Sequence, residues 1–388
     1  MDNSSNKEHI LVFEYCLDGH HLEYLNHLYR YSLQKVSRTT FLVPNHFYDV
    51  AKVLSWPKTD KVDIVTYQFN EHSFYKRNFI LQSLQLCVLL RKYIKTMKPD
   101  KVVLVETTRY LPFLPLLIRK KRLVNSIMYY TPMREKCLSF KHKVLWKSYF
   151  GLLAFEKCFK HVYILNDSKA VQYYNKIYRT NVFSNLPDPY FPLTRYDKCQ
   201  ARSILGLDLN KTIFLHLGAL SSRKGTVEIL EALQQSSRHM LANASFVFVG
   251  SVSQSIRQQF YAIYEQLRNK IDIYIVDSFV DFPTIAYYLS ATDFLLIPYK
   301  NTNQSSGMCA YSAQYKVPVL GPSSGLIGEI IIENELGMCL EMITPSTIAD
   351  GINLLIKGNI VVNELKANAY LEKNTIERFC KILLDNDL

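Results

Sequence analysis

Long apolar runs are missing from this sequence. No stretch of 18 or more apolar residues occurs, and a membrane-spanning helix needs about that length. Residues 1–9 are polar and lack the apolar core of a secretory signal. The eight cysteines form no CxxC pair and have no histidine partners at metal-binding spacing, which argues against a zinc site or a disulfide framework. We therefore expect a cytoplasmic protein whose cysteines are reduced and mostly buried.

Two further motifs are absent. A Gly-x-Gly-x-x-Gly pattern does not follow the first apolar run at residues 9–13, which counts against a nicotinamide-binding domain. An Asp-x-Asp pair follows none of the predicted strands and occurs only in the tail, from Asp385 to Asp387. The sequence therefore predicts neither a metal nor a bound cofactor.

The composition is that of a globular protein with more than one core. The 388 residues are 48% hydrophobic and 21% charged, so a sizeable interior can form. Short apolar, β-branched runs alternate with helical patterns, which predicts parallel sheets covered by helices on both faces. The predicted strands are residues 9–13, 40–43, 62–67, 101–105, 126–130, 161–165, 212–217, 245–249, 271–276, 293–297 and 317–320.

A Pro-rich passage at residues 185–192 interrupts this alternation. We therefore predict an α/β protein of two Rossmann-like, doubly wound parallel-sheet domains that face a central cleft. Residues 1–194 form the N-terminal domain and residues 195–370 the C-terminal domain, while residues 371–388 form a helix that packs back toward the N-terminal domain. Ligands of such sheets bind beyond the carboxyl ends of the strands, so the loops there are where a site is expected.

Positive charge is concentrated in the first half. Residues 1–195 hold 30 Lys and Arg against 15 Asp and Glu, whereas the remainder holds 16 against 19. The densest part is interleaved with aromatic residues and contains Arg119, Lys120, Lys121, Arg122, Arg134, Lys136, Lys141, Lys143 and Lys147. Such a stretch attracts the phosphates of an anionic membrane surface or a lipid-linked molecule, or it is a plain solvated helix face. No nucleic-acid motif accompanies the charge, so we expect no nucleic-acid partner.

The second half opens with a strand, a loop and a helix suited to an anion. Gly218 follows the strand, and Arg223 and Lys224 precede Gly225 and an apolar-periodic helix. Free backbone N–H groups at the helix start, together with two cations, favour a diphosphate. The alternative is that the two cations belong to a solvated turn.

A second polar loop follows the predicted strand at residues 293–297. It starts with Pro298 and Tyr299, and the next helix begins at the polar run Gln304, Ser305, Ser306 and Gly307. Backbone amides and serine hydroxyls at a helix start can bind an anion or a sugar hydroxyl. A glycine-punctuated loop at residues 321–329 could close on the same ligand.

These features together resemble family 4 of the retaining glycosyltransferases, which have the two-domain GT-B fold. The resemblance rests on the order of strand, glycine, loop serines, Arg-Lys-Gly and helix, and then on Pro298-Tyr299, the Ser-Ser-Gly helix start and residues 316–319 and 325–329. It covers residues 195–370 well and is weaker in the first half. It implies a metal-free transfer with retention in which Lys224 holds the diphosphate of a nucleotide-sugar donor and Gly225 lets the helix approach.

The sequence departs from the family pattern at two places. Gln304 and Ser312 stand where the family has two glutamates separated by seven residues, and Ala219 stands where an arginine usually precedes the lysine. We expect Arg223 to replace that arginine and Gln304 to hydrogen-bond sugar hydroxyls, because an amide both donates and accepts. The loss of both carboxylates leaves two readings open, a divergent enzyme and a catalytically silent partner that binds the donor.

Polar residues also follow predicted strands in the first half, on what the resemblance makes the acceptor side. They are Gly19, His20 and His21 after the first strand, Glu106 after the fourth and Arg134 after the fifth. We expect His20 to take part in catalysis and the other four to contact the acceptor. The alternative for the two histidines is that they are plain surface residues of a loop.

The sequence therefore predicts a hexosyltransferase that moves a sugar from a nucleotide sugar to a glycan or lipid-linked acceptor. The expected setting is surface polysaccharide synthesis (capsule, lipopolysaccharide or exopolysaccharide), in the cytoplasm or peripherally on the inner face of the membrane. A sugar-nucleotide epimerase on the same scaffold is the enzyme alternative, and the silent donor-binding partner is the non-enzyme alternative.

Overall fold

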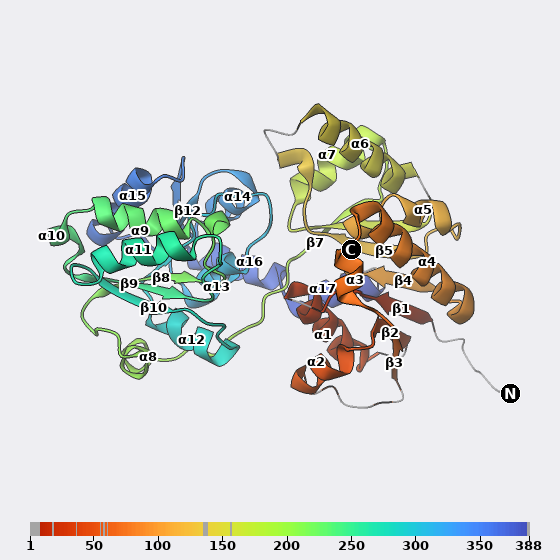
Figure 1. The fold of residues 1–388 in the computed structure, drawn as a ribbon, viewed down its shortest axis with the longest axis horizontal. Helices are drawn as coiled ribbons and strands as arrows, with labels where there is room; N and C mark the ends of the chain where they lie inside the picture. Colours follow the sequence, from red (N-terminus) through yellow and green to blue (C-terminus); the bar gives the residue numbers. More distant parts are fainter. Residues whose placement is uncertain are drawn as a thin grey trace. The chain divides into compact units, whose positions relative to one another are not determined.

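The computed structural model describes residues 8–385 except for residues 18, 36, 55, 57, 58, 60, 135–138 and 156. Lys136 of the basic stretch and the end of the Asp-x-Asp match, Asp387, lie outside the described residues. The chain divides into two compact units: Met1–Asp188 together with Ile376–Leu388, and Pro189–Thr375. Each unit contains one sheet (Figure 1).

The first unit is built on a parallel sheet of seven strands in the order β3-β2-β1-β4-β5-β6-β7. The strands are β1 His9–Phe13, β2 Arg38–Pro44, β3 Val62–Tyr67, β4 Lys101–Leu104, β5 Val124–Met128, β6 Phe159–Leu165 and β7 Phe183–Leu186. The helices are α1 His20–Ser32, α2 Phe47–Leu54, α3 Glu71–Tyr75, α4 Phe79–Met97, η1 Thr108–Tyr110, α5 Phe113–Leu117, η2 Pro132–Arg134, α6 Phe140–Phe155, α7 Ser168–Tyr178 and α17 Ile376–Asp385.

Strand β1 shows why this sheet is covered on both faces. Leu11 and Phe13 belong to one hydrophobic cluster and Ile10 and Val12 to another, and all four side chains are buried. Because successive side chains of a strand point to opposite faces, a continuous apolar run requires cover on both.

The C-terminal helix α17 belongs to the first unit. Phe379, Cys380, Ile382, Leu383 and Leu384 pack in the same cluster as Ile10 and Val12. Three polar side chains of the sheet bind the last carbonyls of this helix: Tyr163 donates to Ile382 O at 3.0 Å, Asn125 to Leu383 O at 3.0 Å, and Lys101 to Leu384 O. These bonds satisfy carbonyls that a helix end otherwise leaves unpaired.

The second unit is built on a parallel sheet of six strands in the order β10-β9-β8-β11-β12-β13. The strands are β8 Thr212–Leu217, β9 Ala244–Val249, β10 Asp272–Val276, β11 Phe294–Leu296, β12 Val319–Pro322 and β13 Gly337–Leu340. The helices are α8 Lys198–Leu205, η3 Ser222–Lys224, α9 Thr226–Gln235, α10 Arg238–Leu241, α11 Arg257–Leu267, α12 Phe282–Ala291, α13 Gly307–Tyr315, α14 Gly325–Glu333, α15 Pro345–Lys357 and α16 Glu364–Lys373. Helices α9, α11 and α15 cover one face, and α8, α12 and α13 cover the other (Figure 1).

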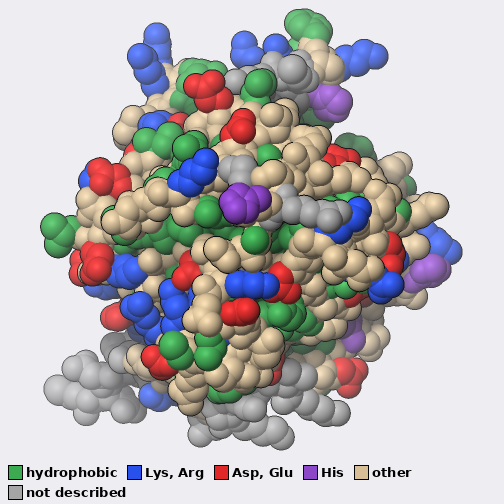
Figure 2. Space-filling model, turned by 90° about the vertical axis from the view of Figure 1, so that its left-hand side faces the viewer, with side chains coloured by type: hydrophobic (Ala, Val, Ile, Leu, Met, Phe, Trp, Pro, Cys, Tyr) green, Lys and Arg blue, Asp and Glu red, His purple; other side chains and the backbone are tan. Residues whose placement is uncertain are grey.

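The predicted fold class, two α/β domains with parallel sheets, is confirmed. The structure adds two strands that the sequence did not predict, β7 and β13. Each has four residues and lies at the edge of its sheet, where only one neighbour pairs with it and the apolar pattern is short. On the face of the second unit seen in Figure 2, cations and carboxylates are interspersed, consistent with the small net charge of the second half.

Candidate functional site

The loop after β8 brings together four of the predicted donor-site residues. Gly218 and Gly225 both have left-handed backbone, with φ of +101° and +71°. A Cβ on Gly225 would lie 2.2 Å from the carbonyl oxygen of Pro298, and one on Gly218 would lie 2.5 Å from Lys224 Nζ. Only glycine permits both this conformation and this approach, so the loop is pressed against the segment that follows β11.

Arg223 and Lys224 share one aromatic neighbour at this point. Arg223 Cζ lies 6.0 Å and Lys224 Nζ 5.2 Å from the centre of the Tyr299 ring. Within the described residues, neither cation has a carboxylate partner within 4 Å. Lys224 Nζ donates to the carbonyl of Leu217 at 3.4 Å. Two cations at the carboxyl edge of the sheet, beside the start of the ten-residue helix α9, make an unneutralised positive site suited to a diphosphate.

A buried histidine that the sequence did not single out holds this loop in place. His216 Nδ1 lies 2.8 Å from Leu296 O, and its Nε2 lies 2.9 Å from Thr226 Oγ1. A carbonyl only accepts, so Nδ1 carries the hydrogen and Nε2 accepts from the Thr226 hydroxyl, which in turn accepts from Ser221 N at 3.0 Å. Burial lowers the pKa of His216 from 6.5 to about 4, so the imidazole is neutral at pH 7.

The second predicted loop leads into α13. Gln304 and Ser305 are half-buried, Ser306 caps the helix, and Gly307 is exposed. Ser312 has a different setting, because its side chain is completely buried and its hydroxyl donates to Val317 O at 2.7 Å. The structure thus leaves Gln304 to Gly307 accessible at the carboxyl edge and places Ser312 in the core.

The glycine-punctuated loop that follows β12 is packed against this second loop. A Cβ on Gly325, which has φ of +72°, would lie 2.1 Å from Thr302 Oγ1. The backbone N–H of Ile327 donates to Thr302 O at 3.2 Å. The loops after β8, β11 and β12 therefore form one continuous edge in the second unit.

The first unit places two of the residues predicted to contact an acceptor, His21 and Glu106, close to a buried acid, Glu14. Gly19 has φ of +53° and precedes α1. His21 Nδ1 lies 3.0 Å from Glu14 Oε2, and the other carboxylate oxygen of Glu14 accepts from Tyr15 N and Cys16 N at 2.7 and 2.9 Å. Tyr15 OH donates to Glu106 Oε2 at 2.7 Å, and burial raises the pKa of Glu106. The sequence patterns did not single out Glu14, although it directly follows β1.

The side chain of His20 lies beside Glu23 of the same helix. It is largely exposed, and Nδ1 lies 3.3 Å from Glu23 Oε2 on the next turn of α1. The hydrogen bond to Glu23 raises the pKa of His20. Burial would raise the pKa of Glu23, but the hydrogen bond with His20 and the imidazole of His27, 3.7 Å away, outweigh that effect and lower this pKa to about 2.

Arg134 is separate from this group. It forms two bonds of 2.7 Å to the carboxylate of Asp167, and both side chains are buried. Asp167 Oδ1 also accepts from Ala170 N at 2.9 Å and so caps α7. The guanidinium of Arg134, which the sequence predicts to contact an acceptor, thus joins η2 to the start of α7.

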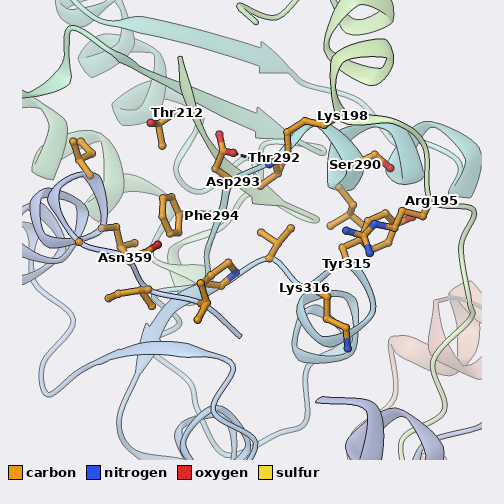
Figure 3. Close-up of a pocket in the computed structure, with 18 of the residues that line it drawn as sticks. Arg195, Lys198, Thr212, Ser290, Thr292, Asp293, Phe294, Tyr315, Lys316 and Asn359 are labelled. Carbon is orange, nitrogen blue, oxygen red and sulfur yellow. Dashed lines mark hydrogen bonds and ion pairs between the residues drawn. The ribbon is translucent and has the colours of Figure 1, made fainter. Parts of the chain in front are cut away.

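A cavity of about 780 Å³ lies at the opposite, amino-terminal edge of the second sheet (Figure 3). Its walls include Thr212 and Phe294, the first residues of β8 and β11. Three of the charged groups in its walls are engaged within the protein: Asp293 accepts from Lys198 at 2.8 Å and from Arg202 at 2.5 Å, and Lys316 donates to Asn368. We therefore place the candidate donor site at the carboxyl edge.

The described residues form neither a metal cluster nor a membrane-spanning helix. No group of three or more His, Cys, Asp or Glu side chains among them is arranged to hold a metal ion. Of the helices in this part of the chain, none has the length and apolarity needed to cross a bilayer.

Comparison with known structures identifies the fold as GT-B. WaaG, a glycosyltransferase involved in lipopolysaccharide biosynthesis, superimposes with a TM-score of 0.67 at 14% identity, over 97% of this chain and 99% of that one. A glycosyltransferase from Rickettsia africae gives 0.71 at 15% identity, over 98% of both chains. HepE of Anabaena, in complex with UDP and glucose, gives 0.68 at 13% identity, over 98% and 99%.

The sequence comparisons concern the second unit. Residues 197–374 match the sequence model of the family described as Glycosyl transferases group 1. This unit, which carries Arg223 and Lys224, is therefore a glycosyltransferase group 1 domain. No curated protein sequence matches the chain.

Proposed function

We propose that this protein is a glycosyltransferase that transfers a sugar from a nucleotide sugar, with retention and without a metal. The observation that carries the proposal is the pair Arg223 and Lys224, which has no carboxylate partner among the described residues and lies beside the start of α9. The pair belongs to the region that matches a glycosyltransferase family. HepE, which has the same fold, is known in complex with UDP-glucose.

The chemistry follows from where the charge develops. As the bond between the sugar and the nucleotide diphosphate breaks, negative charge grows on the diphosphate. Lys224, Arg223 and the first N–H groups of α9 would stabilise that charge. The half-buried Gln304 and the hydroxyls of Ser305 and Ser306 would hold sugar hydroxyls at the neighbouring loop. In the first unit His20 remains the candidate for catalysis, and Gly19, His21 and Glu106 remain candidates for contact with the acceptor.

For the acceptor we propose a glycan or lipid-linked molecule of surface polysaccharide synthesis, reached by a protein that acts in the cytoplasm at the inner face of a membrane. Helix α6 supports this part of the proposal, because it exposes Phe140 and Phe155 beside Lys141, Lys143 and Lys147. Exposed aromatic and cationic side chains on one helix suit an anionic lipid surface. Binding to anionic vesicles that survives replacement of all three lysines by glutamine would refute it.

A thermal-shift screen against UDP-, GDP- and other nucleotide sugars tests the donor site. A ligand of the native state raises the apparent melting temperature by mass action, so one nucleotide class should shift the native protein and not Lys224→Ala. Lys366→Ala is the matched control, because that lysine pairs with Glu335 elsewhere on the same unit. No shift with any nucleotide would contradict the proposal.

Turnover assays separate the proposed enzyme from its alternatives. Release of the nucleotide diphosphate only when acceptor is present supports a transferase, whereas conversion of the donor without acceptor supports an epimerase. Binding without turnover would favour the silent partner, which the replacement of two glutamates by Gln304 and the buried Ser312 makes a real candidate.

A further inference from the structure

We propose that Tyr299 is the positioning residue that holds Arg223 and Lys224 in place for the diphosphate, and that it does so through the face of its ring. The inference rests on the proposed function and assigns Tyr299 a role different from donor contact. Only 2% of its surface is exposed, so the side chain cannot itself touch a bound donor.

The backbone around Tyr299 is locked to the cationic loop on both sides. Pro298 O is in close approach to Gly225, and the N–H of Lys300 donates to Arg223 O at 2.9 Å. Lys300 Nζ also pairs with Glu228 on α9. Tyr299 is therefore fixed relative to Arg223 and Lys224 by neighbours on either side of it.

A ring suits this position better than an acid would. Two like charges close together repel, and something must hold them before the ligand arrives. A carboxylate would hold them but cancel charge that the diphosphate needs. An aromatic face attracts cations through its quadrupole and adds no net charge. In a chain that has Gln304 and Ser312 in place of two acids, the ring keeps both cations ordered and unneutralised.

The competing explanation is that Tyr299 only fills the core, since it belongs to the same buried hydrophobic cluster as Ile297, Met308 and Cys309. Its hydroxyl is buried and bonds to no other described residue, so the oxygen does nothing there that phenylalanine would lose. Tyr299→Phe therefore keeps the ring, and Tyr299→Leu and Tyr299→Met keep apolar bulk but remove it.

The experiment is a calorimetric titration of the full-length protein with pyrophosphate, the donor's charged part alone. Tyr299→Phe should bind within twofold of the native protein. Tyr299→Leu and Tyr299→Met should bind about five- to thirty-fold more weakly, which is about 1–2 kcal/mol at 1.4 kcal/mol per tenfold. In a protein that also carries Arg223→Ala and Lys224→Ala, removing the ring should have no further effect.

Three results would overturn the inference. One is pyrophosphate affinity in the leucine or methionine variant equal to that of the native protein. Another is an equal loss in the background without the two cations, which is the signature of general damage to the core. The third is the absence of an aromatic ring-current shift in the NMR resonances of the Lys224 side chain, in both the native and the Tyr299→Phe proteins. This readout does not require the ring-less variants to fold.

The outcomes also separate this inference from the proposed function. A native protein that binds pyrophosphate or a nucleotide sugar, with affinity that does not depend on the ring, overturns only the role of Tyr299. A native protein that binds neither overturns both.

Discussion

His216 should make the second unit sensitive to acid over a defined pH range. Its pKa is about 4 in the fold, against 6.5 in an unfolded chain, because burial disfavours the charged imidazolium and outweighs the hydrogen bond to Leu296 O, which by itself raises the pKa. Between these two values the unfolded chain takes up a proton that the folded unit does not. Stability is therefore complete above pH 6.5 and falls as the pH decreases, until both states are protonated below about pH 4.

The size of the effect follows from the same two values. At 1.36 kcal/mol per pKa unit, the drop from 6.5 to about 4 corresponds to a loss of about 3 kcal/mol. The assay is urea unfolding of the native protein and His216→Gln at a series of pH values. The variant starts less stable at pH 7.5, because it loses the packing of the buried ring, but its stability should decline less toward pH 4.

A direct measurement can refute this reasoning. Nitrogen-15 spectra of labelled histidine report both the titration midpoint and the tautomer of His216. The structure requires hydrogen on Nδ1 and a midpoint near 4. A midpoint near 6.5, or hydrogen on Nε2, would show that the imidazole does not link Leu296 to Thr226 in this way.

Three other changes have defined outcomes. Gly225→Ala forces a Cβ to 2.2 Å from Pro298 O at φ of +71°, so it should lower the free energy of unfolding by about 2 kcal/mol or more and abolish nucleotide-dependent thermal shifts. Gly206→Ala is the control, because Gly206 has φ of +66° but open space around it; this change should lower the free energy of unfolding by only about 1–2 kcal/mol and leave binding intact. Arg134→Met leaves the buried Asp167 carboxylate unpaired and should lower the stability of the first unit by about 3–5 kcal/mol in chemical unfolding; a loss below 1 kcal/mol would contradict a buried, structural ion pair. Ending the chain at Thr375 removes five buried side chains of α17, each worth about 1.5–3 kcal/mol, and should leave a first unit that exposes apolar surface and aggregates, as dye binding and light scattering would show.

The parts of the fold that could be predicted from sequence are those in which the signal is local. The interior strands are continuous apolar runs, and the loop after β8 is marked by a glycine, two cations and a second glycine within eight residues. Both kinds of pattern reflect physics that acts within one segment: burial on two faces, and backbone conformations that only glycine accepts.

The parts that could not be predicted depend on partners distant in sequence. His216 reads as one more strand residue until Leu296, eighty positions later, lies against it. Arg134 follows a predicted strand, which suggests ligand contact. Only the pairing of β5 with β6 brings Asp167, which follows β6, close enough to accept from its guanidinium. Tyr299 reads as a loop aromatic, and its burial beneath two cations comes from the approach of Gly225 to Pro298.

Restoring the two glutamates that the family resemblance leads one to expect should give unequal results. Gln304 is half-buried at the start of α13, so Gln304→Glu places a carboxylate where solvent still reaches and the helix start favours negative charge. It should fold with little loss of stability. Ser312 is completely buried, and Ser312→Glu would remove the bond to Val317 O and place a larger, unpaired charge in the core.

Ser312→Glu should therefore lower the stability of the second unit by several kcal/mol, measured by urea unfolding at pH 7.5. Ser312→Ala is its matched control, because it removes only the hydroxyl bond and should cost about 1 kcal/mol. If Ser312→Glu were as stable as the native protein, α13 would have to turn until residue 312 is no longer buried. A single substitution could then restore the second carboxylate to the site. The observed packing requires the opposite: the second acid cannot return to this chain without a change in the core around it.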